Sequence, residues 1–280
     1  GYKEGRAYDL ESYAEMKFGS NKEVFLNAVK NFDSDFYLMI YGDVRNAIND
    51  GKYKATALHH FIANGYKEGR AYDLESYAEM KFPNNKAEYV ILANNFDEDF
   101  YLSRYVDVKN AINNGSYKAN ALHHFLNYGY KEGRVSSADY ANTKKGTINS
   151  DVINGDDYNN IIRGDAGDDI INGKKGSDLL TGGQGNDIFK YSNLNESTIN
   201  TADIITDFTK SEDKIDLSSL DFITILREDQ LNQENNLNFS SEQVLTYSYD
   251  QENNQTIIQN QDFQIKLIGN INLDEGDFGF

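Results

Sequence analysis

The stretch that decides the fold runs from Gly146 to Lys190 and reads GTINSDVIN, GDDYNNIIR, GDAGDDIIN, GKKGSDLLT, GGQGNDIFK, five nonapeptides in one frame. Glycine opens every nonapeptide, and position eight is always apolar: Ile153, Ile162, Ile171, Leu180 and Phe189. A chain that alternates short strands with tight turns needs inward apolar residues on the strands and glycine where φ is positive. The nonapeptides therefore predict a coil of short strands joined by Gly-rich turns.

The turns of this coil have the composition of a calcium site. Ca2+ takes about six to eight oxygen ligands and accepts carboxylates together with backbone carbonyls. The repeat follows the pattern G-G-x-G-x-D-x-U-x of calcium-binding parallel β-helices. If two nonapeptides complete one coil, turns on the same edge are 18 residues apart, and each ion lies between stacked turns.

This spacing predicts about three ions, at Asp151/Asp169, Asp169/Asp187 and Asn160/Asp178, with the Asn160 site weakest because it lacks one charge. The full set of predicted metal-site residues is Asp151, Asn160, Gly164, Asp168, Asp169, Gly173, Gly176, Asp178, Gly182, Gly183, Gly185 and Asp187. An EF-hand from Asp165 is excluded by Ile170 and Gly176, and a P-loop ending at Lys174 is excluded by Asp168 and Lys175.

Position seven of each nonapeptide is also apolar, and it should point outward because neighbours on a strand face opposite sides. One face carries Val152, Ile170 and Ile188, and the other carries Ile161 and Leu179. Two interpretations stay open. The residues are there for strand propensity, or flanking domains or a neighbouring molecule cover at least one stripe.

Charge separates the two halves of the chain. The net charge is −18; residues 1–134 hold 17 Lys+Arg against 19 Asp+Glu, and residues 135–280 hold 10 against 26. Divalent cations suit such an acidic half, and nucleic acid does not. There is no cysteine, so calcium is the plausible substitute for disulfides. No run resembles a signal peptide or a membrane span, and because the chain opens within a motif at Gly1 we expect a fragment.

The N-terminal half repeats with a period of 64 residues: GYKEGR occurs at Gly1, Gly65 and Gly129, and residues 1–18 and 65–82 are identical. Such duplication indicates one helical unit stacked on its copy. Helices are expected at 9–18 and 22–31, then from the acidic start at Asp33 through Ile48, and finally a stripe around Phe61 that stops at Gly65.

The pairs His59-His60 and His123-His124 invite a metal or catalytic reading. Adjacent helix residues diverge by about 100°, so we expect one histidine to pack or cap and the other to be solvated. The 20 tyrosines could form a glycan-binding surface, but half-buried packing is favoured.

After Lys190 the pattern turns to strands, with a hairpin turn at 250–255. We expect this segment to cap the coil. Asp203, Asp207, Asp213 and Asp216 could add calcium ligands, although solvated acids are the favoured interpretation.

Residues 146–280 resemble the RTX family, specifically the β-roll and cap of serralysin-type secreted metalloproteases. The resemblance is carried by GGQGNDIFKY, ADIITDFTKSEDKIDLSSL and DFQIKLIGNINLDEGDFGF. It implies a type I exporter that reads an uncleaved signal at about 268–280, and folding only in extracellular calcium. The helical units look like modules of RTX surface-layer proteins and adhesins.

The expected fold is α+β and multidomain: all-α tandem repeats (1–134), a linker (135–145), a parallel β-roll (146–190) and a β-strand cap (191–280). The expected function is the C-terminal region of a secreted, extracellular calcium-binding surface protein. The alternative is the non-catalytic tail of a secreted RTX hydrolase. No H-E-x-x-H occurs, so the segment is expected not to be an enzyme. Expected partners are calcium, the exporter and either copies of itself or cell-surface glycans.

Overall fold

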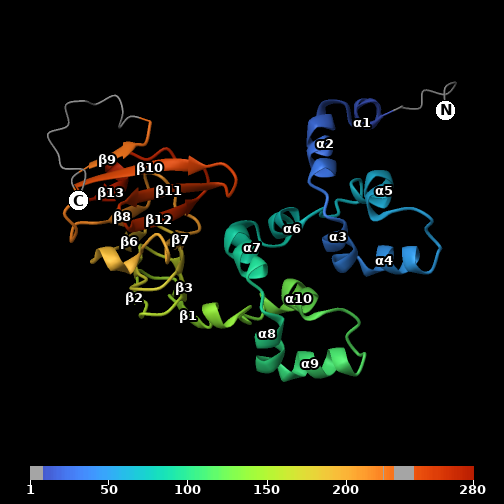
Figure 1. The fold of residues 1–280 in the computed structure, drawn as a ribbon, viewed down its shortest axis with the longest axis horizontal. Helices are drawn as coiled ribbons and strands as arrows, with labels where there is room; N and C mark the ends of the chain where they lie inside the picture. Colours follow the sequence, from blue (N-terminus) through green and yellow to red (C-terminus); the bar gives the residue numbers. More distant parts are fainter. Residues whose placement is uncertain (1–8, 223, 230–242) are drawn as a thin grey trace. The chain divides into compact units, whose positions relative to one another are not determined.

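The computed structural model describes residues 9–222, 224–229 and 243–280, so the first GYKEGR lies outside the described residues. Two compact units are present, one made of residues 1–90 and 105–131 and the other of residues 91–104 and 132–280. Helices dominate the first unit and mostly parallel sheets the second (Figure 1). The chain is therefore of the α+β class, with a parallel β-roll-like fold.

The first unit is built from short helices. They are α1 Leu10–Phe18, α2 Lys22–Lys30, α3 Ser34–Ile40, α4 Gly42–Asn49, α5 Ala57–His60, α6 Leu74–Lys81, α9 Val106–Asn113 and α10 Ala121–His124. Helix α7 (Lys86–Asn94) begins in this unit, and α8 (Glu98–Arg104) belongs to the second. Asp9 caps α1 by accepting from the Ser12 N–H, which supplies a partner that the first helical turn lacks. The helices expected at 9–18 and 22–31 are thus α1 and α2.

Two sequence expectations about these helices are wrong. The helix expected from Asp33 to Ile48 breaks at Tyr41, whose φ of −101° and ψ of 79° are not helical. At this break the Tyr41 hydroxyl accepts a hydrogen bond from the Ala71 N–H. Gly65 does not end its helix in a left-handed conformation. It lies in a π-helical turn (Phe61–Gly65) where a Cβ would collide with the Tyr37 hydroxyl.

The histidines pack against tyrosines, as expected for a structural role. Nδ1 of the half-buried His60 lies 3.1 Å from the hydroxyl of the buried Tyr37, and Nδ1 of the exposed His59 lies 2.7 Å from Tyr53 Oη. His123 makes the matching contact with Tyr117 in the second repeat, at 2.6 Å. These contacts use the ring nitrogens within the helical unit and give no sign of a metal site there.

The arginine of the GYKEGR motif, Arg70, fastens the motif to the preceding helices and acts as a clamp. Arg70 donates to both carboxylate oxygens of Asp43 at 3.0 and 2.8 Å and to Glu68 at 2.6 Å. Its guanidinium also lies 4.8 Å from the centroid of the Tyr41 ring. A planar guanidinium can pair with a carboxylate and stack on a ring at once, which an ammonium cannot.

Arg70→Ala is expected to destabilise the helical unit by about 1–2 kcal/mol, since a bidentate pair and a ring contact are lost from a mostly buried side chain. Thermal unfolding followed by helical circular dichroism measures this change. Lys52→Ala is the matched control, because the Lys52–Asp50 pair is exposed on both sides and should contribute less than about 0.5 kcal/mol. Equal effects of the two variants would contradict the clamp.

The nonapeptides wind into a coil with one strand on each of two sheets. Strands β1 (Asn142–Lys145), β3 (Asn160–Ala166) and β5 (Leu179–Gln184) pair in parallel in one sheet. Strands β2 (Val152–Asn154), β4 (Ile170–Asn172) and β6 (Ile188–Lys190) pair in parallel in the other. Ile162 pairs with Leu180 and Ile171 with Phe189, a shift of 18 residues that confirms two nonapeptides per coil.

Residues beyond the nonapeptides extend both sheets. Strand β1 starts at Asn142, inside the range assigned to a linker, because it pairs with β3 as the first rung of the roll. At the other end, β7 (Asp203–Ile205) joins β5, and β8 (Lys214–Asp216) joins β6. The sheets are completed by β9 (Thr224–Arg227), β10 (Val244–Asp250), β11 (Gln255–Asn260), β12 (Phe263–Ile268) and β13 (Phe278–Gly279). The expected hairpin is the antiparallel β10–β11 pair.

One apolar core joins the roll to the cap. The position-eight residues Ile162, Ile171, Leu180 and Phe189 are at most 1% exposed and cluster with Ile205 and Ile215 of the cap strands. Of the position-seven residues, Ile161 and Leu179 are 1% exposed, whereas Val152 is 71% exposed. The segment Ala138–Tyr140 (η5) contacts β3, the strand that carries Ile161, whereas Val152 on β2 stays open.

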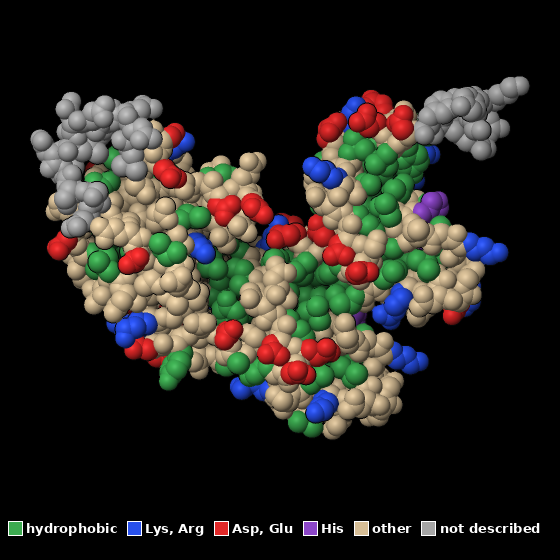
Figure 2. All heavy atoms as spheres, in the orientation of Figure 1, with side chains coloured by type: hydrophobic (Ala, Val, Ile, Leu, Met, Phe, Trp, Pro, Cys, Tyr) green, Lys and Arg blue, Asp and Glu red, His purple; other side chains and the backbone are tan. Residues whose placement is uncertain are grey.

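On the face drawn in Figure 2, Lys and Arg side chains lie scattered among acidic ones. No helix in the described ranges has the length and hydropathy needed to cross a bilayer.

Candidate metal centre

The sixth-position side chains form two hydrogen-bonded ladders along the turns. On one edge, Asp169 Oδ1 accepts from the Asp151 N–H at 2.7 Å, and Asp187 Oδ1 accepts from the Asp169 N–H at 2.9 Å. On the other edge, Asp178 Oδ1 accepts from the Asn160 N–H at 2.8 Å. The structure therefore brings together all three residue pairs that the 18-residue spacing predicts.

The cap continues both ladders with residues that the nonapeptide period does not reach. Asp203 Oδ1 accepts from the Asp178 N–H, and Asp213 Oδ1 from the Asp187 N–H, both at 2.9 Å. Asp203 is 0% and Asp213 4% exposed, so the expectation that they are solvated is wrong. Their spacings to the preceding rung are 25 and 26 residues, which hides them from a search at a fixed period. The available signal was Asp203-Ile204-Ile205, which repeats Asp169-Ile170-Ile171.

The other two cap acids have ordinary polar partners. Asp207 accepts from the N–H groups of Gly182 and Gly183, both at 2.9 Å. Asp216 pairs with Lys190 at 2.9 Å. These acids fasten the cap to the last turn.

Four of the ladder carboxylates keep their second oxygen buried and without a hydrogen-bond partner. They are Asp169, Asp178, Asp187 and Asp203, each through Oδ2. Burial raises the pKa of Asp178 to about 8 and that of Asp187 to about 7, and it also raises the pKa of Asp169 and Asp203. The buried Tyr191 side chain interacts with Asp203, and this interaction opposes the rise in the pKa of Asp203. An ionised carboxylate buried this way is unstable unless a cation compensates it.

The turn glycines face these oxygens closely enough that no side chain fits. A Cβ on Gly164 would collide with Asp169 Oδ2 and with the Gly182 carbonyl oxygen of the next coil. A Cβ on Gly173 or Gly182 would likewise collide with Oδ2 of Asp178 or Asp187. At Gly164 a carboxylate oxygen and a carbonyl oxygen thus share one cradle, and at Gly173 and Gly182 a carboxylate oxygen lies against the turn. Both oxygen types are ligands that calcium takes.

The remaining predicted residues take other places. Gly176, Gly183 and Gly185 stack directly over backbone of the preceding coil at Tyr158, Asp165 and Gly167. Asp168 is exposed, and the Asn186 N–H donates to it at 2.8 Å, which lowers the pKa of Asp168. In the described ranges, no three His, Cys, Asp or Glu side chains gather as a metal site. A cation in the roll would therefore need backbone carbonyls beside its carboxylates.

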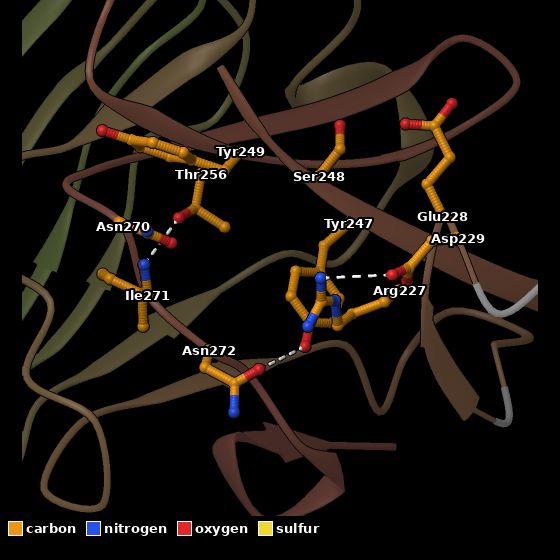
Figure 3. Close-up of a pocket in the computed structure, with 10 residues that line it drawn as sticks. All are labelled: Arg227, Glu228, Asp229, Tyr247, Ser248, Tyr249, Thr256, Asn270, Ile271 and Asn272. Atoms are coloured by element: carbon orange, nitrogen blue, oxygen red, sulfur yellow. Dashed lines mark hydrogen bonds and ion pairs between the residues drawn. The ribbon is translucent and has the colours of Figure 1, made fainter. Parts of the chain in front are cut away.

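The cap holds a separate cavity of 720 Å³ whose lining includes Arg227, Asp229, Tyr247 and Asn272 (Figure 3). Its polar groups already pair with one another. Tyr247 Oη donates to Asn272 Oδ1 at 3.0 Å, and Arg227 pairs with Asp229 at 3.2 Å. The turns of the roll are the stronger candidate, because buried carboxylate oxygens without hydrogen-bond partners lie there.

Comparison with known proteins identifies a family for the same part of the chain. Residues 129–278 match the family described as peptidase M10 serralysin C terminal. No curated protein matches the chain.

Three solved structures are similar to about half of the chain. The AlgE6R3 subunit of the Azotobacter vinelandii mannuronan C5-epimerase is 25% identical, with 51% of this chain and 80% of that chain covered and a TM-score of 0.40. The AlgE6R2 subunit of that enzyme is 22% identical, with 52% and 95% covered and a TM-score of 0.34. The extracellular lipase LipA of Serratia marcescens is 16% identical, with 49% and 20% covered and a TM-score of 0.28.

Proposed function

The chain belongs to the peptidase M10 serralysin C-terminal family, and from this premise we propose that residues 142–280 are a calcium-folded module of a secreted RTX protein. The observation that carries the proposal is the set of four buried, unpartnered carboxylate oxygens at the turns. Removing them from water is unfavourable without a cation, and the adjoining carbonyl oxygens complete a donor set that suits calcium.

The module would hold calcium with Asp169 and Asp187 on one edge of the roll, and with Asp178 and Asp203 on the other. Calcium supplies positive charge there, and the chain supplies the rest. Stacked backbone N–H groups hold each Oδ1, and Oδ2 of Asp169, Asp178 and Asp187 lies against the turn glycines. Metal binding and folding are then one process, because the oxygens converge only when the coils are stacked.

We propose that the helical repeats of residues 1–134 carry the adhesive or structural role, and that the roll and cap serve export and folding. The whole would be the C-terminal part of an extracellular surface-layer or adhesin protein, exported by a type I system through residues 268–280. Copies of itself or cell-surface glycans are the proposed partners. The tail of a secreted RTX hydrolase is the second candidate, which the family match favours equally. In either case the described segment has a non-catalytic role.

Isothermal titration with calcium tests the metal function. Wild-type protein should bind calcium with a simultaneous gain of β circular dichroism, and magnesium should not replace it, since Mg2+ is smaller and loses water reluctantly. The double variant Asp178→Asn/Asp187→Asn should lose most of the binding, because it removes a charged ligand on each edge. Asp157→Asn is the control, since this acid is exposed and lies outside the ladders. A wild-type protein that binds no calcium would overturn the proposal.

A further inference from the structure

The five turns of the roll fall into two backbone classes. Within residues 142–222, all of which are described, the second residue of the turn has a positive φ in the last three turns: 77° at Asp165, 72° at Lys174 and 110° at Gly183. Positive φ also occurs at the fourth residue of these turns, Gly167, Gly176 and Gly185. The equivalent residues of the first two turns, Thr147 and Asn149, and Asp156 and Tyr158, are not left-handed. The first coil therefore turns in another way.

In the first turn, neighbouring groups already satisfy the carboxylate. Asp151 Oδ2 accepts from the Thr147 N–H at 2.7 Å and from the Thr147 hydroxyl at 2.8 Å. The equivalent oxygens of Asp169 and Asp187, one and two coils further on, have no partner. Thr147 thus supplies to Asp151 what a cation would supply in the later turns.

In the second turn, the side chain of Asn160 makes hydrogen bonds to Asp156 within the turn. Asn160 is 0% exposed, its Oδ1 accepts from the Asp156 N–H at 2.8 Å, and its Nδ2 donates to Asp156 Oδ1 at 2.9 Å. The bond from Asn160 lowers the pKa of Asp156. Gly155 faces Asn160 Oδ1 as Gly173 faces Asp178 Oδ2, so Asn160 Oδ1 takes the place of the oxygen that has no partner in Asp178. In the second turn this oxygen already has a partner in the Asp156 N–H.

We infer that the first coil, residues 146–163, is a metal-free end of the roll, in which hydrogen bonds from Thr147 and from the Asp156 N–H replace calcium. The inference rests on the proposed calcium function and changes its stoichiometry. The four unpartnered oxygens form two pairs, Asp169 with Asp187 and Asp178 with Asp203, so two ions are bound. The sites expected at Asp151/Asp169 and Asn160/Asp178 are not used. Because the terminal coil satisfies its polar groups with its own hydrogen bonds, it can form without calcium, and the calcium-bound turns can stack on it.

Native mass spectrometry of the whole chain in calcium counts the ions directly. Wild-type protein should bind two ions, and Asn160→Ala should still bind two, with a lower thermal midpoint because Asp156 loses its partner. Asp178→Asn should remove one ion, since Asp178 serves a single site. A count of three for the wild type, with loss of one ion in Asn160→Ala, would overturn the inference. A count of zero would instead overturn the calcium function itself.

A variant designed to gain a calcium site tests the same inference about the first coil. Asp157→Ala, Tyr158→Gly and Asn160→Asp together convert the turn GDDYNN into GDAGND, close to GDAGDD at residues 164–169. The change removes the donating amide and allows positive φ at the fourth residue of the turn. The triple variant should bind one ion more than the wild type, and in EDTA it should be less stable than the wild type. An unchanged count would show that the turn sequence does not decide where calcium binds.

Discussion

In EDTA, the protein is expected to keep the helices of its first unit and to lose the sheets of residues 142–280. The helices have apolar contacts and caps that do not involve the acidic turns. The roll has four buried carboxylate oxygens without partners, in a region whose net charge is strongly negative. Hydrogen exchange measured by mass spectrometry resolves the two regions, and calcium should restore protection only in residues 142–280. A roll fully protected in EDTA at pH 8 would contradict metal-coupled folding.

Acid should partly replace calcium in that experiment. The pKa values of Asp178 and Asp187, raised by burial to about 8 and about 7, lie above the roughly 3.9 of an unfolded Asp. The folded, metal-free roll therefore binds more protons than the unfolded chain from about pH 4 to pH 8, and its stability falls as pH rises through that range. In EDTA the roll should be better protected at pH 5 than at pH 8. The opposite order would show that these carboxylates are not buried in the folded roll.

Phe189→Ala is expected to destabilise the second unit by about 3–5 kcal/mol, as for other fully buried aromatic side chains. Phe189 is 0% exposed and belongs to the core that joins the roll strands to the cap strands. Its ring centroid lies 6.4 Å from that of Phe208. Since calcium binding and folding are coupled, with two ions the calcium concentration at half-folding should rise about tenfold or more.

Val152→Ala is the matched control for Phe189→Ala. Val152 lies one position earlier in its nonapeptide, on the outward side of β2, and is 71% exposed. Its truncation should change stability by less than about 0.5 kcal/mol. Calcium titrations followed by circular dichroism give both midpoints. Similar shifts in the two variants would contradict the inward and outward assignment of positions eight and seven.

The regular part of the fold could be predicted from the sequence because its signal is periodic. A fixed nine-residue frame gives the strands, their inward residues and the 18-residue register. The helical unit is harder to predict from the sequence. The break at Tyr41 depends on a hydrogen bond with Ala71, 30 residues away, and no local pattern reports such a contact. The start of the roll at Asn142 was missed for a similar reason, since β1 is a strand only through its pairing with β3.

The sequence predicts which residues form the ladders of the candidate site. It does not predict which of them keep an unpartnered oxygen. The spacing identified Asp169, Asp178 and Asp187 as ladder residues, and each keeps an unpartnered buried oxygen. It could not separate Asp151 from Asp169, because the difference lies in the Thr147 hydroxyl and in the backbone of the turn. It named Asp203 as a possible ligand but favoured a solvated acid, because an irregular segment of 25 residues replaces the expected 18 between two stacked rungs.

The pairing of the two sheets with the cap also limits how the length of this module can change. Strand β5 must meet β7, and β6 must meet β8, because the cap brings these two strands to opposite sheets. Deleting one nonapeptide would move every preceding half-coil, together with the chain that leads into it, to the other edge. Deleting two nonapeptides removes one whole coil and preserves both edges. Insertions and deletions tolerated in such rolls should therefore come in steps of 18 residues, even though the sequence repeats every nine.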